Sequence, residues 1–332
     1  MSAESLVSAR GLSKRFVKKP DFAGRIAGHL GADVREETVH AVDHVDLDIR
    51  KGEVVGLVGE SGCGKSTLGR MIAGLLTPTE GAVQFKGKPR DALSGSEAHA
   101  ARLAIQMIFQ DPFASLNPRA RVEAIVGEAP LVHGITTRTG MSAYVDDMLR
   151  RVGLDPELKR RYPHQFSGGQ RSRIGIARAL AVNPEFLVCD EAIAALDVSI
   201  QAQIINLFMD LRSEFDLTYL FISHDLGVVE HITDRVVIMY LGRVVESAST
   251  EVLFDGPNHP YAQALLAEVP RISTEKRTFH PIKGEIPSPL NPPSGCHFHP
   301  RCPRAFGRCR NEVPVLKEIA PGRYSACHLN DA

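Results

Sequence analysis

Short apolar runs recur along the chain and predict the strands of a sheet. Residues 39–49 (VHAVDHVDLDI) place apolar side chains at nearly alternate positions, which is typical of a half-buried strand. Further apolar runs predict strands at 53–59 (EVVGLVG), 104–109 (AIQMIF), 186–189 (FLVC), 219–222 (YLFI) and 236–241 (VVIMYL). Helical patterns lie between these runs, and the clearest of them is 199–214 (SIQAQIINLFMDLRSE). The run at 53–59 is followed by a glycine-rich turn and an amphipathic segment, which favours a parallel α/β sheet.

Two segments differ from this pattern. Residues 17–38 carry mixed charge and three glycines and resemble an insertion before the core strands. Phe22, Ile26 and Leu30 have helical spacing there, so a docked helix and a loop both remain open. Residues 281–303 hold seven prolines, which predicts a linker or an irregular tail. We therefore expect a main domain over 1–255, with a helical part at 111–166, and a tail over 256–332.

Composition narrows the class of protein. The chain has 332 residues, 43% hydrophobic and 23% charged, as expected for a globular domain with a smaller appendage. Lys+Arg and Asp+Glu are both 39, and this zero net charge weighs against a nucleic-acid partner. No run approaches the roughly 18 apolar residues of a membrane span. The first residues lack the apolar core of a signal peptide. We expect a cytoplasmic protein that meets a membrane only through a partner.

A phosphate-binding loop is predicted directly after the strand at 53–59. The run GESGCGKST fits the pattern G-x-x-x-x-G-K-[ST] and leads into a predicted helix. Backbone N–H groups of such a loop surround phosphate oxygens, and the helix adds the positive end of its dipole. Lys65 would reach the phosphates and Ser66 would bind Mg²⁺. The loop comprises Gly59, Glu60, Ser61, Gly62, Cys63, Gly64, Lys65, Ser66 and Thr67.

An acidic pair follows the strand at 186–189. In a doubly wound sheet, the carboxyl end of a central parallel strand is where ligands bind. Asp190 suits the Mg²⁺ shell, and Glu191 suits a general base that polarises the attacking water. Without the upstream loop, such a pair would often only cap a helix.

The order of motifs resembles that of ABC-transporter ATPase subunits. S-G-G-Q at Ser167, Gly168, Gly169 and Gln170 lies between the loop and the acidic pair, and His224 follows the next predicted strand. The resemblance covers residues 6 to about 250. It implies an α/β P-loop NTPase core with a helical subdomain, an antiparallel β subdomain and a small Cys- and Pro-rich C-terminal appendage.

The resemblance also implies roles for single residues. Ser167 is a good N-cap, and in the family this helix start contacts the γ-phosphate held by a partner subunit in a head-to-tail dimer. Gln110 would sense Mg²⁺ and the attacking water, and His224 would contact the γ-phosphate. Asp197 would touch the partner. Phe16 would stack on adenine, although a core phenylalanine fits nearly as well.

Longer runs are similar to the ATPases of oligopeptide and dipeptide importers. These runs are GLVGESGCGKST, IFQDPFASLNPR, FSGGQRSRIGIARAL, LDVSIQAQIINL and, in the tail, NHPYAQALL and GEIPSPLNPPSGCHFHPRCP. The insertion before the loop resembles the second of the two ATPases usually paired in these importers. Nickel or another small solute remains an alternative cargo within the same subfamily.

The family also implies partners and a location. We expect two transmembrane permease subunits, a homologous ATPase subunit or a second copy of this chain, and an extracytoplasmic solute-binding protein that acts indirectly. The chain would sit at the cytoplasmic face of the inner membrane. An ABC-type ATPase acting on DNA is disfavoured, because only 102 residues separate Lys65 from Ser167 and no heptad run lies between them. A two-cassette translation factor and a non-catalytic subunit fit less well.

The segment DEAIAALD at 190–197 departs from the family pattern. Ala192 replaces a proline and Ala194 replaces a serine. Both carboxylates remain, so we expect activity to be retained and the segment that meets the partner to be looser.

The tail gathers four of the six cysteines. A cytosolic cluster of this kind indicates metal ligation more than disulfides. The spacing is not the paired C-x2-C of a zinc ribbon, whereas iron–sulfur clusters take four thiolates at variable spacing. A [4Fe–4S] cluster, zinc and free thiols stay open, and the resemblance favours the cluster. The cysteines are Cys296, Cys302, Cys309 and Cys327.

Overall fold

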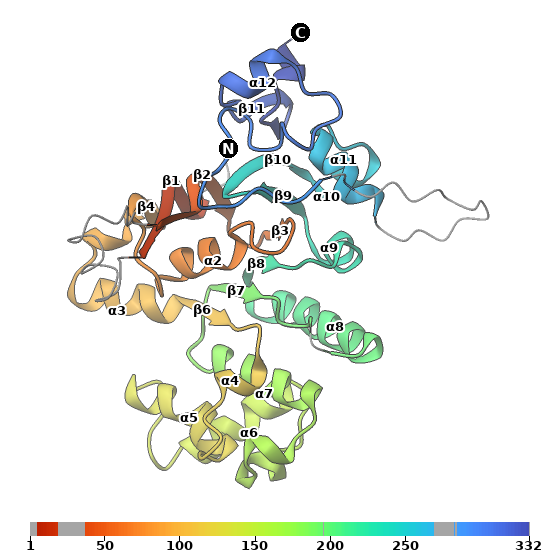
Figure 1. The fold of residues 1–332 in the computed structure, drawn as a ribbon. Helices are drawn as coiled ribbons and strands as arrows, with labels where there is room; N and C mark the ends of the chain where they lie inside the picture. Colours follow the sequence, from red (N-terminus) through yellow and green to blue (C-terminus); the bar gives the residue numbers. More distant parts are fainter. Residues whose placement is uncertain (1–4, 19–36, 195, 269–281, 283, 332) are drawn as a thin grey trace, which may run out of the picture.

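Two sheets and a set of surrounding helices make up the chain (Figure 1). The computed structural model describes residues 5–18, 37–194, 196–268, 282 and 284–331. The predicted helical spacing of Phe22, Ile26 and Leu30 lies outside the described residues.

The larger sheet has eight strands in the order β11-β12-β10-β9-β3-β8-β7-β6. Its five strands from β9 to β6 run parallel, and the three at the other end pair antiparallel. The parallel strands are buried on both faces, which explains their continuous apolar runs. All five predicted parallel strands are confirmed. The strands are β3 Val54–Val58, β6 Ile105–Ile108, β7 Phe186–Asp190, β8 Thr218–Ile222, β9 Arg235–Tyr240, β10 Arg243–Ser249, β11 Lys317–Ala320 and β12 Arg323–Ser325.

The smaller sheet is antiparallel, in the order β2-β1-β4-β5. Its strands are β1 Ser5–Lys18, β2 Glu37–Arg50, β4 Glu80–Phe85 and β5 Lys88–Pro89. The alternating run at 39–49 lies in β2, where one face packs on the core and the other is exposed. The antiparallel subdomain implied by the resemblance is confirmed.

Helices cover both faces of the larger sheet. Helix α2 lies between the two sheets and shares one hydrophobic core with them, through Leu68, Met71 and Ile72. The clearest predicted helix, 199–214, is α8. The helices are α2 Lys65–Ala73, α3 Gly95–Ala104, α4 Pro112–Ser115, α5 Val122–Val132, α6 Met141–Arg151, α7 Gly168–Leu180, α8 Val198–Phe215, α9 Leu226–Ile232, α10 Thr250–Asp255, α11 Pro260–Ala267 and α12 Gly307–Asn311, with short 3₁₀ turns at Arg90–Ala92, Pro156–Arg160, Pro163–Gln165 and His328–Asp331.

Helices α4 to α7 form a lobe below the sheet in Figure 1. Val126, Leu149 and Ile174 come from three of these helices and are fully buried in one core, which continues to the face of the sheet through Leu187 and Phe221. Helices α4, α5 and α6 lie within 111–166, whereas α7 lies beyond it, and the bounds of the helical part stay a prediction.

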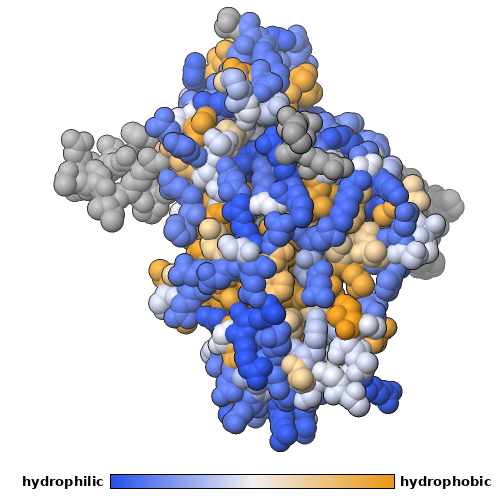
Figure 2. All heavy atoms as spheres, turned by 180° about the vertical axis from the view of Figure 1, so that it is seen from behind, coloured by the Kyte–Doolittle hydropathy of each residue, from blue (hydrophilic) through white to orange (hydrophobic). Residues whose placement is uncertain are grey.

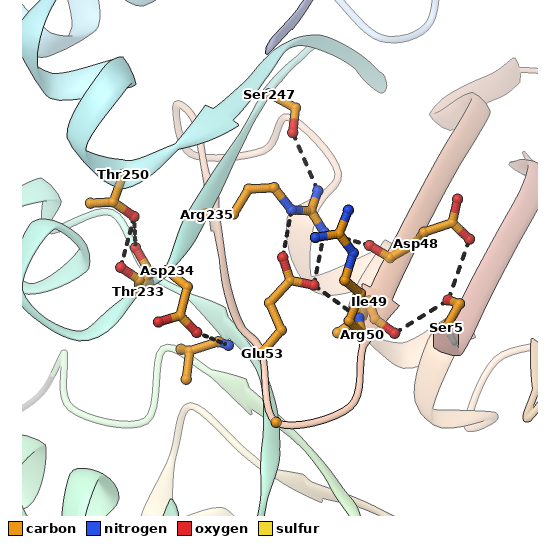
Figure 3. Close-up of polar contacts among 12 residues, drawn as sticks. Ser5, Asp48, Ile49, Arg50, Glu53, Thr233, Asp234, Arg235, Ser247 and Thr250 are labelled. Carbon is orange, nitrogen blue, oxygen red and sulfur yellow. Dashed lines mark hydrogen bonds and ion pairs between the residues drawn. The ribbon is translucent and has the colours of Figure 1, made fainter. Parts of the chain in front are cut away.

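Arg235 joins the two sheets at the start of β9 (Figure 3). Its Nε lies 2.7 Å from Glu53 Oε1, and a second nitrogen donates to the backbone oxygen of Asp48 in β2. Ser247 of β10 accepts from the same guanidinium at 3.3 Å. One side chain thus connects β2 of the smaller sheet with β9 and β10 of the larger one.

The residues after 255 are attached to the sheet rather than separate from it. Strand β12 pairs with β10, and α11 contributes Tyr261 and Leu265 to a core that also contains Tyr240 and Phe298. The proline-rich stretch was predicted to be irregular, and its described residues between 284 and 303 contain neither helix nor strand. The domain boundary near 255 stays a prediction.

The surface shown in Figure 2 is mostly hydrophilic, with hydrophobic side chains in scattered patches. Among the described residues, no helix is both long enough and apolar enough to span a bilayer.

Candidate functional site

The predicted phosphate loop connects β3 to α2. Gly64 is the N-cap of α2 with φ 106°, a left-handed conformation that favours glycine. A Cβ at this position would lie 2.1 Å from the backbone oxygen of Ala41, so no larger residue fits. The glycine therefore lets the loop turn against β2 and present backbone N–H groups at the start of the helix.

Lys65 is 5% exposed and points back across the loop. Its Nζ donates to the backbone oxygens of Gly59 at 2.7 Å and Glu60 at 3.0 Å. The ammonium is thus held inside the curve of the loop, where a phosphate would meet it.

A cavity of about 460 Å³ opens beside the loop. Its wall includes Lys65, Ser66 and other loop residues, together with Gln110, Glu191 and His224. Ser66 and His224 are 158 positions apart in the chain, yet both line this cavity. The structure brings together the loop, the acidic pair and the lone histidine that the sequence singled out.

Asp190 lies directly behind Ser66, which lines the cavity, and the two side chains form a pair suited to a divalent cation. Ser66 Oγ donates to Asp190 Oδ1 at 2.7 Å. Asp190 is 1% exposed, and its Oδ2 has no hydrogen-bond partner among the described residues. Burial raises the pKa of this carboxyl, and Ser66 partly offsets the rise. A buried, unpaired carboxylate oxygen beside a hydroxyl is a donor set that fits Mg²⁺.

Glu191 lies at the centre of the polar groups in the cavity. Gln110 Nε2 donates to Glu191 Oε2 at 2.7 Å, and His224 Nδ1 lies 3.5 Å from the same oxygen. The backbone of Glu191 has φ 47°, which is uncommon for a residue other than glycine. Its N–H donates to the Ile222 oxygen at the end of β8, and this bond holds the strained turn that aims the carboxylate into the cavity.

Phe16 lies near the cavity but is not part of its wall. It sits on β1 opposite Val39 and is 43% exposed, with Lys14 Nζ 5.3 Å from its ring centre. Val39, Ala41 and Pro289 line the side of the cavity that faces the smaller sheet. The stacking role of Phe16 stays a prediction.

The S-G-G-Q segment begins α7, as predicted. Ser167 Oγ accepts from the Gln170 N–H at 3.3 Å, and Gln170 Oε1 accepts from the Ser167 N–H at 3.1 Å, which is a capping box. A Cβ on Gly169 would lie 2.6 Å from Ile200 of α8, so this glycine permits close packing of the two helices. None of these residues lines the cavity, so one chain does not bring them to its own phosphate loop.

The described residues of the segment 190–197 contact the body of the protein in spite of the replacements at Ala192 and Ala194. Ala192 is buried, and its oxygen accepts from Ser172 Oγ at 3.4 Å. Gln201 donates to the Ile193 oxygen at 3.1 Å. Asp197 is exposed at the N-cap of α8. Whether the segment is looser than in relatives stays a prediction.

The four tail cysteines are free thiols. Burial raises the pKa of the Cys296 thiol to about 11, and the other three cysteines contribute to the rise. Cys296 N–H donates to the Cys309 oxygen at 2.9 Å. Even so, within the described ranges no three His, Cys, Asp or Glu side chains are arranged to hold a metal ion.

Among the residues that approach the loop, Pro289 and Tyr261 were not singled out from the sequence. Pro289 lines the cavity, and Tyr261 Oη accepts from the Glu60 N–H at 2.9 Å. Both lie beyond residue 255, in the segment predicted from the sequence as a C-terminal tail. A proline or tyrosine in such a segment carries no sequence signal for this placement.

Fold and cavity together define a P-loop ATPase of the ABC class, with its S-G-G-Q helix in a lobe separate from its phosphate loop. The chain belongs to the ABC transporter family. Residues 42–194 match the family described as "ABC transporter", and residues 245–309 match "Oligopeptide/dipeptide transporter, C-terminal region".

Known relatives agree with this assignment. The chain is 54% identical over 295 residues to the oligopeptide transport ATP-binding protein AppF of Bacillus subtilis, which covers 88% of this chain and 90% of that relative. Among solved structures, cbiO1 of Clostridium perfringens, part of the ABC transporter complex cbiONQ, is 28% identical with a TM-score of 0.61, covering 76% of this chain and 91% of cbiO1. A dimeric ATP-binding cassette in a post-hydrolysis state, bound to ADP and Pi, is also 28% identical, with a TM-score of 0.62 and coverage of 74% and 98%.

Proposed function

We propose that this chain is the ATP-hydrolysing, energy-coupling subunit of an importer of di- or oligopeptides. The observation that carries the ATPase assignment is the single cavity shared by the phosphate loop, Gln110, Glu191 and His224. The C-terminal match over 245–309 and the similarity to AppF support a peptide cargo.

In this proposal, the loop from Gly59 to Thr67 binds the phosphates of ATP. Lys65 neutralises charge on the β- and γ-phosphates, because its ammonium already lies inside the loop. Ser66, Asp190 and Gln110 would hold Mg²⁺, which supplies charge neutralisation for the leaving phosphate. The buried, unpaired Oδ2 of Asp190 supports that placement.

Glu191 is the proposed general base for the attacking water. Its Oε2 already accepts from Gln110 and lies near His224, so a water in the cavity would be oriented by three side chains. His224 would contact the γ-phosphate. Phe16 would stack on adenine from the neighbouring strand.

The S-G-G-Q helix start would serve ATP bound to a second subunit. The N–H groups of Gly168 and Gly169, which the capping box does not use, would form an anion site at the helix start, and they lie outside the cavity of their own chain. A head-to-tail dimer supplies the missing phosphate and buries exposed Asp197 at the contact. The solved dimeric cassette bound to ADP and Pi supports such a pairing.

Partners in the membrane follow from the importer assignment. We expect two permease subunits that contact the helical lobe at 111–166 from the cytoplasmic face of the inner membrane. A homologous ATPase or a second copy of this chain completes the dimer, and a solute-binding protein delivers cargo without touching this chain.

Uptake in a strain that lacks the gene tests the proposal. Wild-type chain should restore uptake of labelled di- and oligopeptides, and Lys65→Ala should not. Restored uptake of Ni²⁺ without peptide uptake would assign the cargo to the small-solute branch of the family. Normal peptide uptake with Lys65→Ala would refute the energy-coupling role.

The four tail cysteines are proposed to hold a [4Fe–4S] cluster. Their mutual influence on pKa supports convergence of the thiols, although the side chains would have to reorient to bind. Four thiolates would be the protein ligands. Anaerobically purified protein should then contain about four iron and four sulfide per chain, with a visible band that reduction bleaches. One zinc, or no metal, would reject the cluster and leave the ATPase assignment intact.

A further inference from the structure

Glu60, the second residue of the phosphate loop, is held largely by the C-terminal region. Its backbone N–H donates to Tyr261 Oη at 2.9 Å. Its carboxylate accepts two hydrogen bonds from Arg301, from Nη1 at 2.7 Å and from Nη2 at 2.9 Å. Its backbone oxygen accepts from Lys65 Nζ at 3.0 Å. The C-terminal region therefore contacts the residue to which the phosphate-binding lysine is bonded.

The Glu60–Arg301 pair is shielded from water. The Arg301 side chain is 4% exposed and that of Glu60 is 21% exposed. A two-pronged guanidinium–carboxylate contact fixes orientation as well as distance. Burying such a pair requires desolvation energy that a pair of apolar residues would not, so its net contribution to the free energy of folding is small. What the pair does achieve is a fixed position for the Glu60 side chain.

Aromatic rings hold Arg301 and Tyr261 in place. Arg301 lies 5.8 Å from the centre of the Tyr240 ring and donates to Tyr240 Oη at 3.3 Å. The rings of Tyr240 and Tyr261 are 4.6 Å apart, and Phe298 lies 5.2 Å from Tyr240 and 5.3 Å from Tyr261. Tyr240, Tyr261 and Phe298 are each almost fully buried. The two groups that contact Glu60 thus rest on one rigid cluster.

The C-terminal region also reaches the cavity at a second point. The Pro289 oxygen accepts from the His40 N–H at 3.0 Å, and this bond joins the proline-rich segment to β2. Pro289 lines the cavity opposite the loop. Two separate contacts therefore connect this region to the nucleotide site.

We infer that Arg301 is a positioning residue for ATP: through Glu60 it holds the phosphate loop in the conformation that receives the phosphates. The inference rests on the proposed function, because it takes the loop as the ATP site. It assigns the C-terminal region a part in nucleotide affinity and not only in packing.

The test is Arg301→Met in the full-length chain. Loop geometry affects the ground state and the transition state alike, so KM and Kd for Mg·ATP should rise about tenfold while kcat changes less than about twofold. Arg301→Lys keeps the charge but loses the second prong, so it should give an intermediate KM. Steady-state ATPase assays and calorimetric titration with Mg·ATP measure these values.

Two comparisons separate positioning from loss of folding. Arg323→Met removes another ion pair of the C-terminal region, Arg323 with Glu246 at 3.0 Å, which does not touch the loop. It should leave the Kd for ATP unchanged. The double variant Glu60→Gln with Arg301→Met removes both charges. Its Kd for Mg·ATP should be no higher than that of either single variant, because each single variant already removes the same contact.

The outcomes distinguish the inference from the function on which it rests. Loss of ATP binding in Lys65→Ala with a wild-type Kd in Arg301→Met would overturn the inference and leave the function intact. An equal rise in Kd for Arg323→Met, or additive effects in the double variant, would also overturn it. Wild-type protein that binds no ATP would instead overturn the proposed function.

Discussion

His259 makes the stability of the C-terminal region sensitive to acid. The side chain is 1% exposed at the N-cap of α11, and its Nδ1 accepts from the Tyr261 N–H at 3.0 Å. Only a neutral ring can accept there. Burial lowers the pKa of His259 from 6.5 to about 4. The Glu246 carboxylate accepts from the His259 backbone N–H at 2.7 Å and is paired with Arg323.

The sign of the pH effect follows from these two pKa values. The unfolded chain binds a proton on this histidine below about pH 6.5, whereas the folded chain does so only near pH 4. The contribution of neutral His259 to the free energy of unfolding is therefore fully present above the pKa of the unfolded chain. It decreases as the pH falls below that value and is fully lost below the pKa of the folded chain. A difference of this size corresponds to about 3 kcal/mol, of which about 2 kcal/mol is lost by pH 5.

His259→Asn isolates this contribution. Asparagine is a good N-cap, so it can accept from the Tyr261 N–H, but it does not titrate. The free energy of unfolding should fall between pH 7 and pH 5 by about 2 kcal/mol more in wild type than in the variant. Because the chain has no Trp, urea unfolding is followed by circular dichroism. Identical pH dependence in the two proteins would refute the reasoning.

Three further predictions concern the ATP site. Glu191→Gln keeps the contact with Gln110 but removes the general base, so kcat should fall by about 10²- to 10⁴-fold. An ATP-bound dimer should accumulate, which light scattering measures. Unchanged turnover would reject Glu191 as the base. Lys65→Ala should abolish ATPase activity in a phosphate-release assay, and near-normal activity would contradict its role. Gly169→Ala would place a Cβ 2.6 Å from Ile200, so turnover by the dimer should fall at least about tenfold with little change in the Kd for ATP. An equal loss of ATP binding would contradict the proposal that this helix start contacts ATP bound to the partner subunit.

Local sequence was sufficient for the five parallel strands, for β2, for the phosphate loop and for the capped helix, but it did not predict β1, β4, β5 or β10 to β12. The phosphate loop is specified by local features: an apolar run, then glycines that can adopt a left-handed φ, then a lysine. Gly64 illustrates the backbone geometry that these glycines allow. Ser167 and Gln170 are three residues apart, so their capping box is also a local property. The buried parallel strands were legible because each is a continuous apolar run.

Contacts between distant segments depended on the tertiary structure. Gln110, Glu191 and His224 meet only because parallel strands end at one edge, and sequence order does not give their separations. The packing of the C-terminal region against the sheet could not be read from its sequence, because prolines indicate a lack of regular structure and carry no information on burial. Glu60 and Arg301 are 241 positions apart, so no periodicity or spacing in the sequence indicates that they pair. The contact arises only when folding brings the acidic loop residue against the buried guanidinium.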